Sequence, residues 1–342
     1  MFVEVHRAGL AAVTDLGRPG HGRAGIAPNG AADQYSATVA NILVGNPETA
    51  PLIEITASAL TVSFSGPALI AVTGAPAPLG GGHRSWEPVC LPARTPVTIP
   101  AAQGGLRTYL AVHGTLRAPR MLASCAPDPL LGFGIWLRAG SRVGLDTNYV
   151  PFDHPVFRHP LFRLGAPVPR FGSPWTIDVT DGPDTADFAG RILPGARYRV
   201  SPDSDHIGLR LRGPAPIRQR TGEPLSRGVP TGAVEVTPAG ELLVLVRGHP
   251  VTAGYPVIAV TTRAAQPALG QAAPGHELRF RHRERAEAIA AYQARRQALD
   301  RLTTRVRTSF TELGISCPAA QRSIERSVGA NRNRSTDSGN RG

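Results

Sequence analysis

The chain has 342 residues, of which 42% are hydrophobic, and a formal net charge of +12. This length suits two domains with hydrophobic cores, and the 38 glycines and 33 prolines favour short strands joined by many turns. All 37 basic residues are arginine, so a Walker-type phosphate loop and a Schiff-base lysine are both excluded, because each requires lysine.

The remaining composition narrows the class further. Three scattered cysteines argue against a disulfide framework and against a cysteine-ligated metal site, and we expect no metal site. Residues 1–22 lack a signal pattern, and no run approaches the ~18 apolar residues of a membrane helix, so we expect a cytoplasmic protein without membrane contact. Residues 276–342 carry +7 of the charge, but they contain few aromatics and no nucleic-acid motif, so nucleic-acid binding is not expected.

The first distinctive segment, residues 16–46, is dense in Gly, Pro, Asn and Asp. Glycine allows backbone shapes that other residues avoid, and polar side chains such as Arg18 supply groups for an anion or an amide. We interpret the segment as a shaped site leading into a helix. Asp33 can cap that helix, an apolar stripe follows it, and Gly45 stops it. Asn41 lies off the stripe and faces either a cleft or solvent.

Short strands are predicted throughout the rest of the body. Residues 60–64 and 175–180 alternate apolar and polar side chains, as half-buried strands do. Continuous apolar runs bounded by glycine or proline predict strands buried on both faces. These runs are residues 68–72, 109–112, 242–246 and 257–260.

Six prolines between residues 151 and 174 indicate a domain boundary. We therefore divide the chain into strand-rich modules at 1–160 and 161–284, a helical extension at 285–317 and a disordered, Arg-rich tail at 318–342. The extension is rich in helix formers from Glu284 to Arg305, and its spacing favours packing on the body or on a partner over a coiled coil.

A second polar cluster lies in the C-terminal half. Asp205 and His206 are adjacent and suit acid–base work, although neighbouring side chains on a strand point to opposite faces, which favours a structural role for His206. Tyr255 sits in a constrained turn between Gly254 and Pro256 and either faces a pocket or plugs a barrel end. Cys125 is a nucleophile only in principle, because the sequence reveals no local base.

These motifs together resemble the biotin-dependent carboxyltransferase family. Gly-Arg-Pro-Gly stands at 17–20, Pro-Asn-Gly-Ala-Ala-Asp at 28–33 and Ala-Asn-Ile-Leu-Val-Gly-Asn at 40–46. Further matches lie at 52–55, 73–75, 109–112, 204–208 and 252–256. The family includes the C subunits of bacterial ATP-dependent 5-oxoprolinases, allophanate-hydrolase-like second subunits, antagonists of a histidine-kinase inhibitor, and part of urea carboxylase.

The chain also departs from the family pattern. It has Cys125 in a segment that is usually Gly-Ser-Arg-Ser-Thr, His206 where Arg is usual, Glu235 where Gln is usual and Ala253 where Gly is usual. The lost arginines would have been anion contacts, and Glu235 replaces an amide donor by a carboxylate. The resemblance therefore leaves open a different substrate or weakened catalysis.

The resemblance implies a mainly β fold of two packed cyclophilin-like β-barrel modules with few helices. It also implies two partner chains, the smaller, cyclophilin-like B subunit and the A subunit of the same enzyme. Our leading hypothesis is a hydrolase: the C subunit of an ATP-dependent 5-oxoprolinase, active only in a hetero-oligomeric complex, opening the lactam 5-oxoproline to glutamate. ATP, with Mg²⁺, would be bound through the complex.

On this hypothesis Arg18, Asp33 and Glu54 are the candidate catalytic residues. The candidate substrate-binding residues are Asn29, Asn41, Asn46, Thr73, Asp205, Thr252 and Tyr255. One alternative is a carboxyltransferase acting on urea or a related amide; because this chain has no lysine, another chain would carry its biotin. The other is a non-enzymatic antagonist of a kinase inhibitor.

Overall fold

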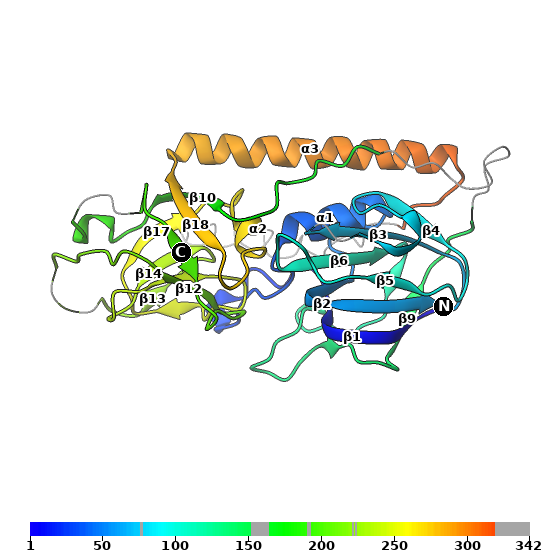
Figure 1. The fold of residues 1–342 in the computed structure, drawn as a ribbon, viewed down its shortest axis with the longest axis horizontal. Coiled ribbons are helices and arrows are strands. Elements are labelled where there is room, and N and C mark those ends of the chain that lie inside the picture. The colour runs from blue at the N-terminus through cyan, green and yellow to red at the C-terminus, as the bar shows by residue number, and fades with distance from the viewer. Residues whose placement is uncertain (76–77, 152–163, 190–192, 221, 223, 319–342) are drawn as a thin grey trace, which may run out of the picture.

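The computed structural model describes residues 1–75, 78–151, 164–189, 193–220, 222 and 224–318. Figure 1 shows two β-rich modules beside one another, with one long helix lying across both. None of the helices within these ranges is both long and apolar enough to cross a membrane. The boundary predicted at residues 160 and 161, and the tail from residue 319, lie outside the described residues.

The first module is a nine-stranded sheet in which the strands pair in the order β4-β3-β6-β2-β1-β9-β7. Strand β5 also pairs with β2, and β8 with β1. Two long strands, β1 and β2, pair antiparallel through most of their length, with irregularities between Val5 and Arg7 and between Ala8 and Leu10. The strands are β1 (Phe2–Thr14), β2 (Leu52–Phe64), β3 (Ala68–Gly74), β4 (Pro88–Leu91), β5 (Val97–Ile99), β6 (Arg107–Val112), β7 (Thr115–Leu116), β8 (Ile135–Trp136) and β9 (Arg142–Asp146).

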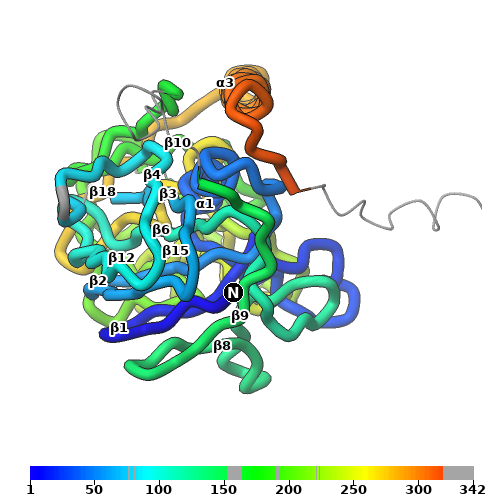
Figure 2. Tube along the Cα trace, turned by 90° about the vertical axis from the view of Figure 1, so that its right-hand side faces the viewer, coloured from blue at the N-terminus to red at the C-terminus, as the bar shows by residue number. Residues whose placement is uncertain are grey.

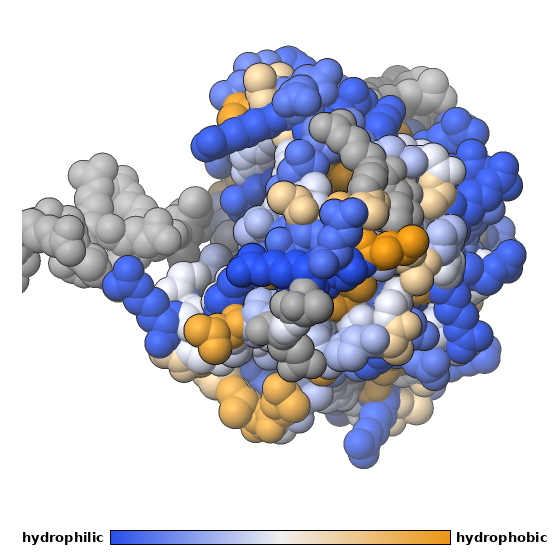
Figure 3. Space-filling view, turned by 90° about the vertical axis from the view of Figure 1, so that its left-hand side faces the viewer, coloured by the Kyte–Doolittle hydropathy of each residue, from blue (hydrophilic) through white to orange (hydrophobic). Residues whose placement is uncertain are grey.

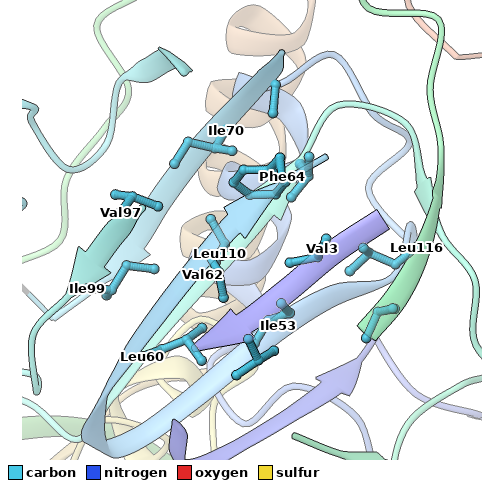
Figure 4. Close-up of a cluster of buried hydrophobic side chains, with 14 of the residues drawn as sticks. Val3, Ile53, Leu60, Val62, Phe64, Ile70, Val97, Ile99, Leu110 and Leu116 are labelled. Atoms are coloured by element: carbon cyan, nitrogen blue, oxygen red, sulfur yellow. The ribbon is translucent and has the colours of Figure 1, made fainter. Parts of the chain in front are cut away.

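Strand β3 shows how the sheet separates two cores. Ile70 and Val72 point into the cluster drawn in Figure 4, whereas Leu69 and Ala71 belong to a second cluster on the opposite face. This alternation follows from the period of two along a strand. The apolar run at 68–72 is therefore buried on both faces, as predicted.

Helix α1 (Gln34–Leu43) covers one face of this sheet. Asp33 caps it, because its Oδ1 accepts a hydrogen bond from the Ser36 backbone N–H at 2.9 Å. Helix α3 (Arg285–Glu312) lies over α1, as Figure 2 shows. Its buried residues Leu299, Leu302, Val306 and Phe310 join the same apolar cluster as α1. The C-terminal helix therefore packs on the body, as predicted, and extends past the expected end at Arg305.

The second module is a closed seven-stranded barrel, with the strand order β10-β17-β14-β15-β12-β11-β18. It closes through a parallel pair, in which Trp175 to Val179 of β10 lie beside Leu278 to His282 of β18. Its strands are β10 (Trp175–Asp181), β11 (Tyr198–Val200), β12 (Gly208–Arg212), β14 (Ala233–Val236), β15 (Leu242–Leu245), β17 (Val257–Thr261) and β18 (Glu277–His282). The outer surface of this end of the molecule is mostly hydrophilic (Figure 3).

A few short elements complete the fold. Strands β13 (Arg227–Gly228) and β16 (Thr252–Ala253) form a separate two-stranded sheet, and α2 (Gln266–Leu269) follows β17. The one-turn helices are η1 (Gly22–Ala24), η2 (Gly80–Gly82) and η3 (Thr185–Asp187).

The predicted fold class is confirmed in its main features: a mainly β chain, few helices, a barrel and a C-terminal helix. One expectation needs correction, because the described strands of the first module form an open sheet and not a second closed barrel. The long β1–β2 pairing leaves edges at β4 and β7 that do not meet. The cyclophilin-like character of the two modules stays a prediction.

Candidate functional site: a pocket between the two modules

The two modules enclose a pocket of about 420 Å³, which we call the central pocket. Its volume falls in the range of ~300–1,000 Å³ that small-molecule sites occupy. Strands β1, β2 and β6 supply one wall, and the barrel supplies the other. The polar or charged lining residues are Thr14, Asn29, Glu54, Thr56, Arg107, Ser204, Asp205, His206 and Arg247, and the apolar ones include Leu10, Trp136, Leu209 and Leu269.

Glu54 is held in place at the sheet wall by two donors. Its Oε2 accepts hydrogen bonds from the Ala32 backbone N–H at 2.9 Å and from the Tyr109 hydroxyl at 2.8 Å. Its Oε1 lies 3.5 Å from Arg107 Nε. Burial, together with the nearby Glu54 and Asp33, raises the pKa of Tyr109 well above its usual value, so the hydroxyl stays a donor. Glu54 is therefore a fixed acceptor facing a guanidinium across the pocket wall.

Two of the candidate residues on the barrel wall are Asp205 and Arg247. Asp205 Oδ1 accepts hydrogen bonds from the backbone N–H groups of Ile207 (2.7 Å) and Gly208 (3.1 Å), which shapes the turn before β12. Arg247 donates to the carbonyls of Asn29 and Leu16, both at 2.8 Å, so it joins the barrel to the first module. Burial, together with Arg263, lowers the pKa of Arg247 to about 10.

Gln271 fixes the distance between the two walls. Its Nε2 donates to Asp33 Oδ2 at 2.8 Å, and its Oε1 accepts from the backbone N–H groups of Leu106 and Arg107. Arg107 in turn donates to the carbonyl of Gly270. The side chain of Gln271 is buried, so these hydrogen bonds are shielded from water. The pocket therefore has a preorganised shape.

Arg18 lies apart from the central pocket and is only 1% exposed. It pairs with Asp128 at 3.2 Å and donates to the carbonyl of Ala126, while Asn29 Nδ2 donates to the same Asp128 carboxylate at 2.8 Å. Arg18 also borders a second cavity of about 580 Å³, the loop cavity, which lies between residues 18–28 and residues 228–266. Its charge is already paired, so it is not the open anion contact that the sequence led us to expect.

Four other candidates make structural hydrogen bonds and line none of the three cavities that we describe. Asp33 caps α1, and burial raises its pKa despite hydrogen bonds from Ser36 and Gln271. Asn41 donates to the carbonyl of Ala50 at 2.9 Å, and Thr73 donates to the carbonyl of Ser36 at 2.7 Å. Asn46 donates to the carbonyl of Val112 and accepts from the Gly114 N–H. Asn41 thus faces neither a cleft nor solvent.

The remaining candidates divide between two places. Thr252 borders the loop cavity, and Tyr255 is exposed and borders none of the three cavities. Cys125 is 1% exposed, and burial raises the pKa of its thiol, which opposes the thiolate that a nucleophile needs. Asn29, Glu54 and Asp205 are thus the predicted residues that the structure brings together around the central pocket.

Sequence reasoning missed Arg107, Tyr109 and Arg247 as site residues. Arg107 and Tyr109 stand at the start of the apolar run predicted as a strand, and alternation along a strand does separate their faces. Arg247 follows another predicted strand. No local pattern pairs either arginine with the opposite module, because Arg247 and Asn29 are 218 positions apart.

A metal-dependent site finds no support in the geometry. Within the described ranges, no group of three or more His, Cys, Asp or Glu side chains is placed to hold a metal ion. The central pocket instead offers carboxylates and guanidinium groups beside apolar walls, a combination that suits a small planar molecule with a charged end.

A β-sheet module joined to a β-barrel around a small-molecule pocket is the class that the fold and site define. Residues 24–282 match the family model described as "Carboxyltransferase domain, subdomain A and B", and the chain belongs to this family. The resemblance predicted from the sequence motifs is therefore confirmed.

Known relatives of the chain are enzymes or components of enzymes. It is 31% identical over 313 residues to the C subunit of 5-oxoprolinase from Escherichia coli (strain K12), a match that covers 89% of this chain and 99% of that protein. It is 28% identical over 286 residues to urea amidolyase of Saccharomyces cerevisiae, covering 77% of this chain but 16% of that protein. The solved urea amidolyase of K. lactis shares the fold, with a TM-score of 0.78 over 88% of this chain and 20% of that chain at 24% identity.

Proposed function

We propose that the chain is the C subunit of an ATP-dependent enzyme that opens 5-oxoproline to glutamate, together with partner chains that resemble the A and B subunits. The observation that carries the proposal is the pairing of Glu54 with Arg107 in a pocket shared by both modules, in a chain that aligns with 99% of the C subunit of a 5-oxoprolinase. A lactam with a carboxylate matches this lining of charges and apolar walls.

Each end of the lactam has a counterpart in the pocket. Arg107 and Arg247 are the cations that line it, and a guanidinium suits the substrate carboxylate. Glu54, fixed by Ala32 and Tyr109, is the acceptor best placed to take a proton from an attacking water. Leu10 and Trp136 supply apolar surface for the ring.

ATP, when bound in the complex, supplies the phosphoryl group that would make the lactam carbonyl oxygen a leaving group. The central pocket does not fit a triphosphate, because its two arginines already hydrogen-bond carbonyls of the chain and the sequence has no lysine. We therefore assign no step through ATP to this pocket and expect a partner chain to contribute that site.

A second candidate is a carboxyltransferase acting on urea, which the similarity to urea amidolyases favours. Biotin would then be carried by another chain, since this one has no lysine to which it could be attached. In this reading Glu54 and Arg107 would orient the amide that accepts the carboxylate.

The test is phosphate release by the purified complex of this chain with its A-like and B-like partners. We expect turnover with 5-oxoproline, and a loss of roughly 10²–10³-fold in kcat for Glu54→Gln, the range that removal of a general base produces. The matched control is Glu241→Gln, an exposed position just before β15, which should retain full activity. Turnover with urea and a biotin carrier, but not with 5-oxoproline, would establish the second candidate, and turnover with neither would reject both.

A further inference from the structure

A third cavity, of about 210 Å³, lies beneath α3 and is here called the helix cavity. Helices α1 and α3 and the segment around α2 line it. Four arginines and one glutamate face this small space, a net charge of +3. The lining arginines are Arg247, Arg263, Arg295 and Arg296, and the glutamate is Glu48.

The one lining carboxylate is already committed. Both Glu48 oxygens accept from Arg296, at 2.8 and 3.0 Å, and Arg296 also donates to Asp300. Asp33, the buried acid whose charge Arg295 senses, is hydrogen-bonded to Ser36 and Gln271. Among the described residues lining the cavity, no acid is left to neutralise Arg247, Arg263 and Arg295.

The uncompensated arginines are held open by aromatic rings rather than by acids. Arg295 lies over the ring of Tyr35 at 5.0 Å, and Arg263 lies over that of Tyr292 at 5.2 Å. Arg295 Nη1 is buried and has no hydrogen-bond partner within the described part of the chain. A buried donor without an acceptor costs roughly 1–3 kcal/mol, more when it is charged. Burial also lowers the pKa of Arg295.

We propose that the helix cavity binds a small, multiply charged oxyanion of the phosphate class, held by Arg295, Arg263 and Arg247. Planar guanidinium groups bind the oxygens of such an anion in pairs, and the anion supplies the acceptor that Arg295 Nη1 lacks. The phosphate source is either free inorganic phosphate or the phosphates of a nucleotide. The inference does not depend on the proposed reaction.

The position of this site gives it a second consequence. The family match ends at residue 282 and α3 begins at Arg285, so one wall of the site is built by a helix beyond the family domain. Arg247 lines both the helix cavity and the central pocket. An oxyanion there would connect α3 to the barrel and contact the arginine that borders the central pocket.

The test is calorimetric titration of the full chain with inorganic phosphate and, separately, with ADP. We expect saturable binding that weakens by about tenfold or more in Arg295→Gln and in Arg263→Gln, since each removes a charged hydrogen-bond donor. Arg301→Gln, an exposed position on the same helix, is the matched control and should bind as the unaltered chain does. Arg23→Gln, which borders only the loop cavity, should also have no effect.

A second measurement guards against variants that fold less well. Phosphate should raise the thermal midpoint of the unaltered chain and of Arg301→Gln, but not of Arg295→Gln, each compared with its own ligand-free midpoint. Phosphate binding alone supports the inference with free phosphate as the source, and tighter ADP binding supports it with a nucleotide as the source. Absence of binding, equal weakening in Arg301→Gln, or loss in Arg23→Gln but not in Arg295→Gln would overturn it.

Discussion

The segment around α1 and the central pocket are both rich in polar side chains, but they use them differently. Around α1, Asn41 and Asn46 are buried, and their amides bond to backbone groups of neighbouring loops and strands. At the central pocket, Glu54 and Arg107 are partly exposed and lie 3.5 Å apart without an ideal hydrogen bond. The first set completes the fold, whereas the second retains capacity for a ligand.

This difference shows that residue type alone does not separate scaffold from site. A buried amide whose donor and acceptor are both occupied has nothing left for a substrate, because each further hydrogen bond would break an existing one. What marks a site is unused bonding capacity that faces a cavity. Three changes would break or sharpen this distinction.

The largest effect is expected for Arg18→Met. This change leaves Asp128 buried without its cation, and breaking a buried pair costs about 3–5 kcal/mol. Urea unfolding followed by circular dichroism measures the loss. Arg117→Met, which breaks an exposed pair with Asp146, is the matched control and should cost less than about 1 kcal/mol. Normal stability with abolished turnover in Arg18→Met would instead return Arg18 to the catalytic residues.

A smaller effect is expected for Asn46→Ala. The Val112 carbonyl and the Gly114 N–H would each lose a buried partner, for a total cost of about 2–3 kcal/mol. The same unfolding measurement applies, and the folded fraction should keep its turnover in the complex. A loss of turnover at unchanged stability would contradict a purely structural role.

Glu235→Gln sharpens the comparison from the other side. Glu235 is 1% exposed with an unpartnered Oε1, yet it lines none of the three cavities. Burial raises its pKa from 4.5 to about 7, so the folded chain holds a proton that the unfolded chain releases. Stability should therefore fall as the pH rises from 4.5 to 7 and then level off.

The glutamine variant should lack this pH dependence. It should be more stable than the unaltered chain at pH 8, by on the order of 2 kcal/mol, and the difference should shrink towards pH 4.5. Unfolding curves at several pH values measure this. An equal difference between the two chains at every pH would show that Glu235 does not titrate in this range.

Local patterns predicted the elements of this fold well. The apolar runs at 68–72 and 109–112 lie in strands β3 and β6, and the capped helix after Asp33 begins as expected. Strand β1 was missed, because His6, Arg7 and two irregularities in its pairing interrupt its alternation. The site was harder, since the Gln271–Asp33 hydrogen bond spans 238 positions and no local pattern encodes such a contact.

The parallel pairing of β10 with β18 bears on how the second module is synthesised. The first strand of the barrel lies beside its last, with Trp175 opposite Leu278, and β17 flanks β10 on the other side. Strand β10 therefore leaves the ribosome roughly 100 residues before β18, and pairings this distant in sequence form slowly. An emerging chain can complete the sheet of the first module while β10 still awaits both neighbours. Chaperone contacts during translation should accordingly concentrate on the stretch between these two strands.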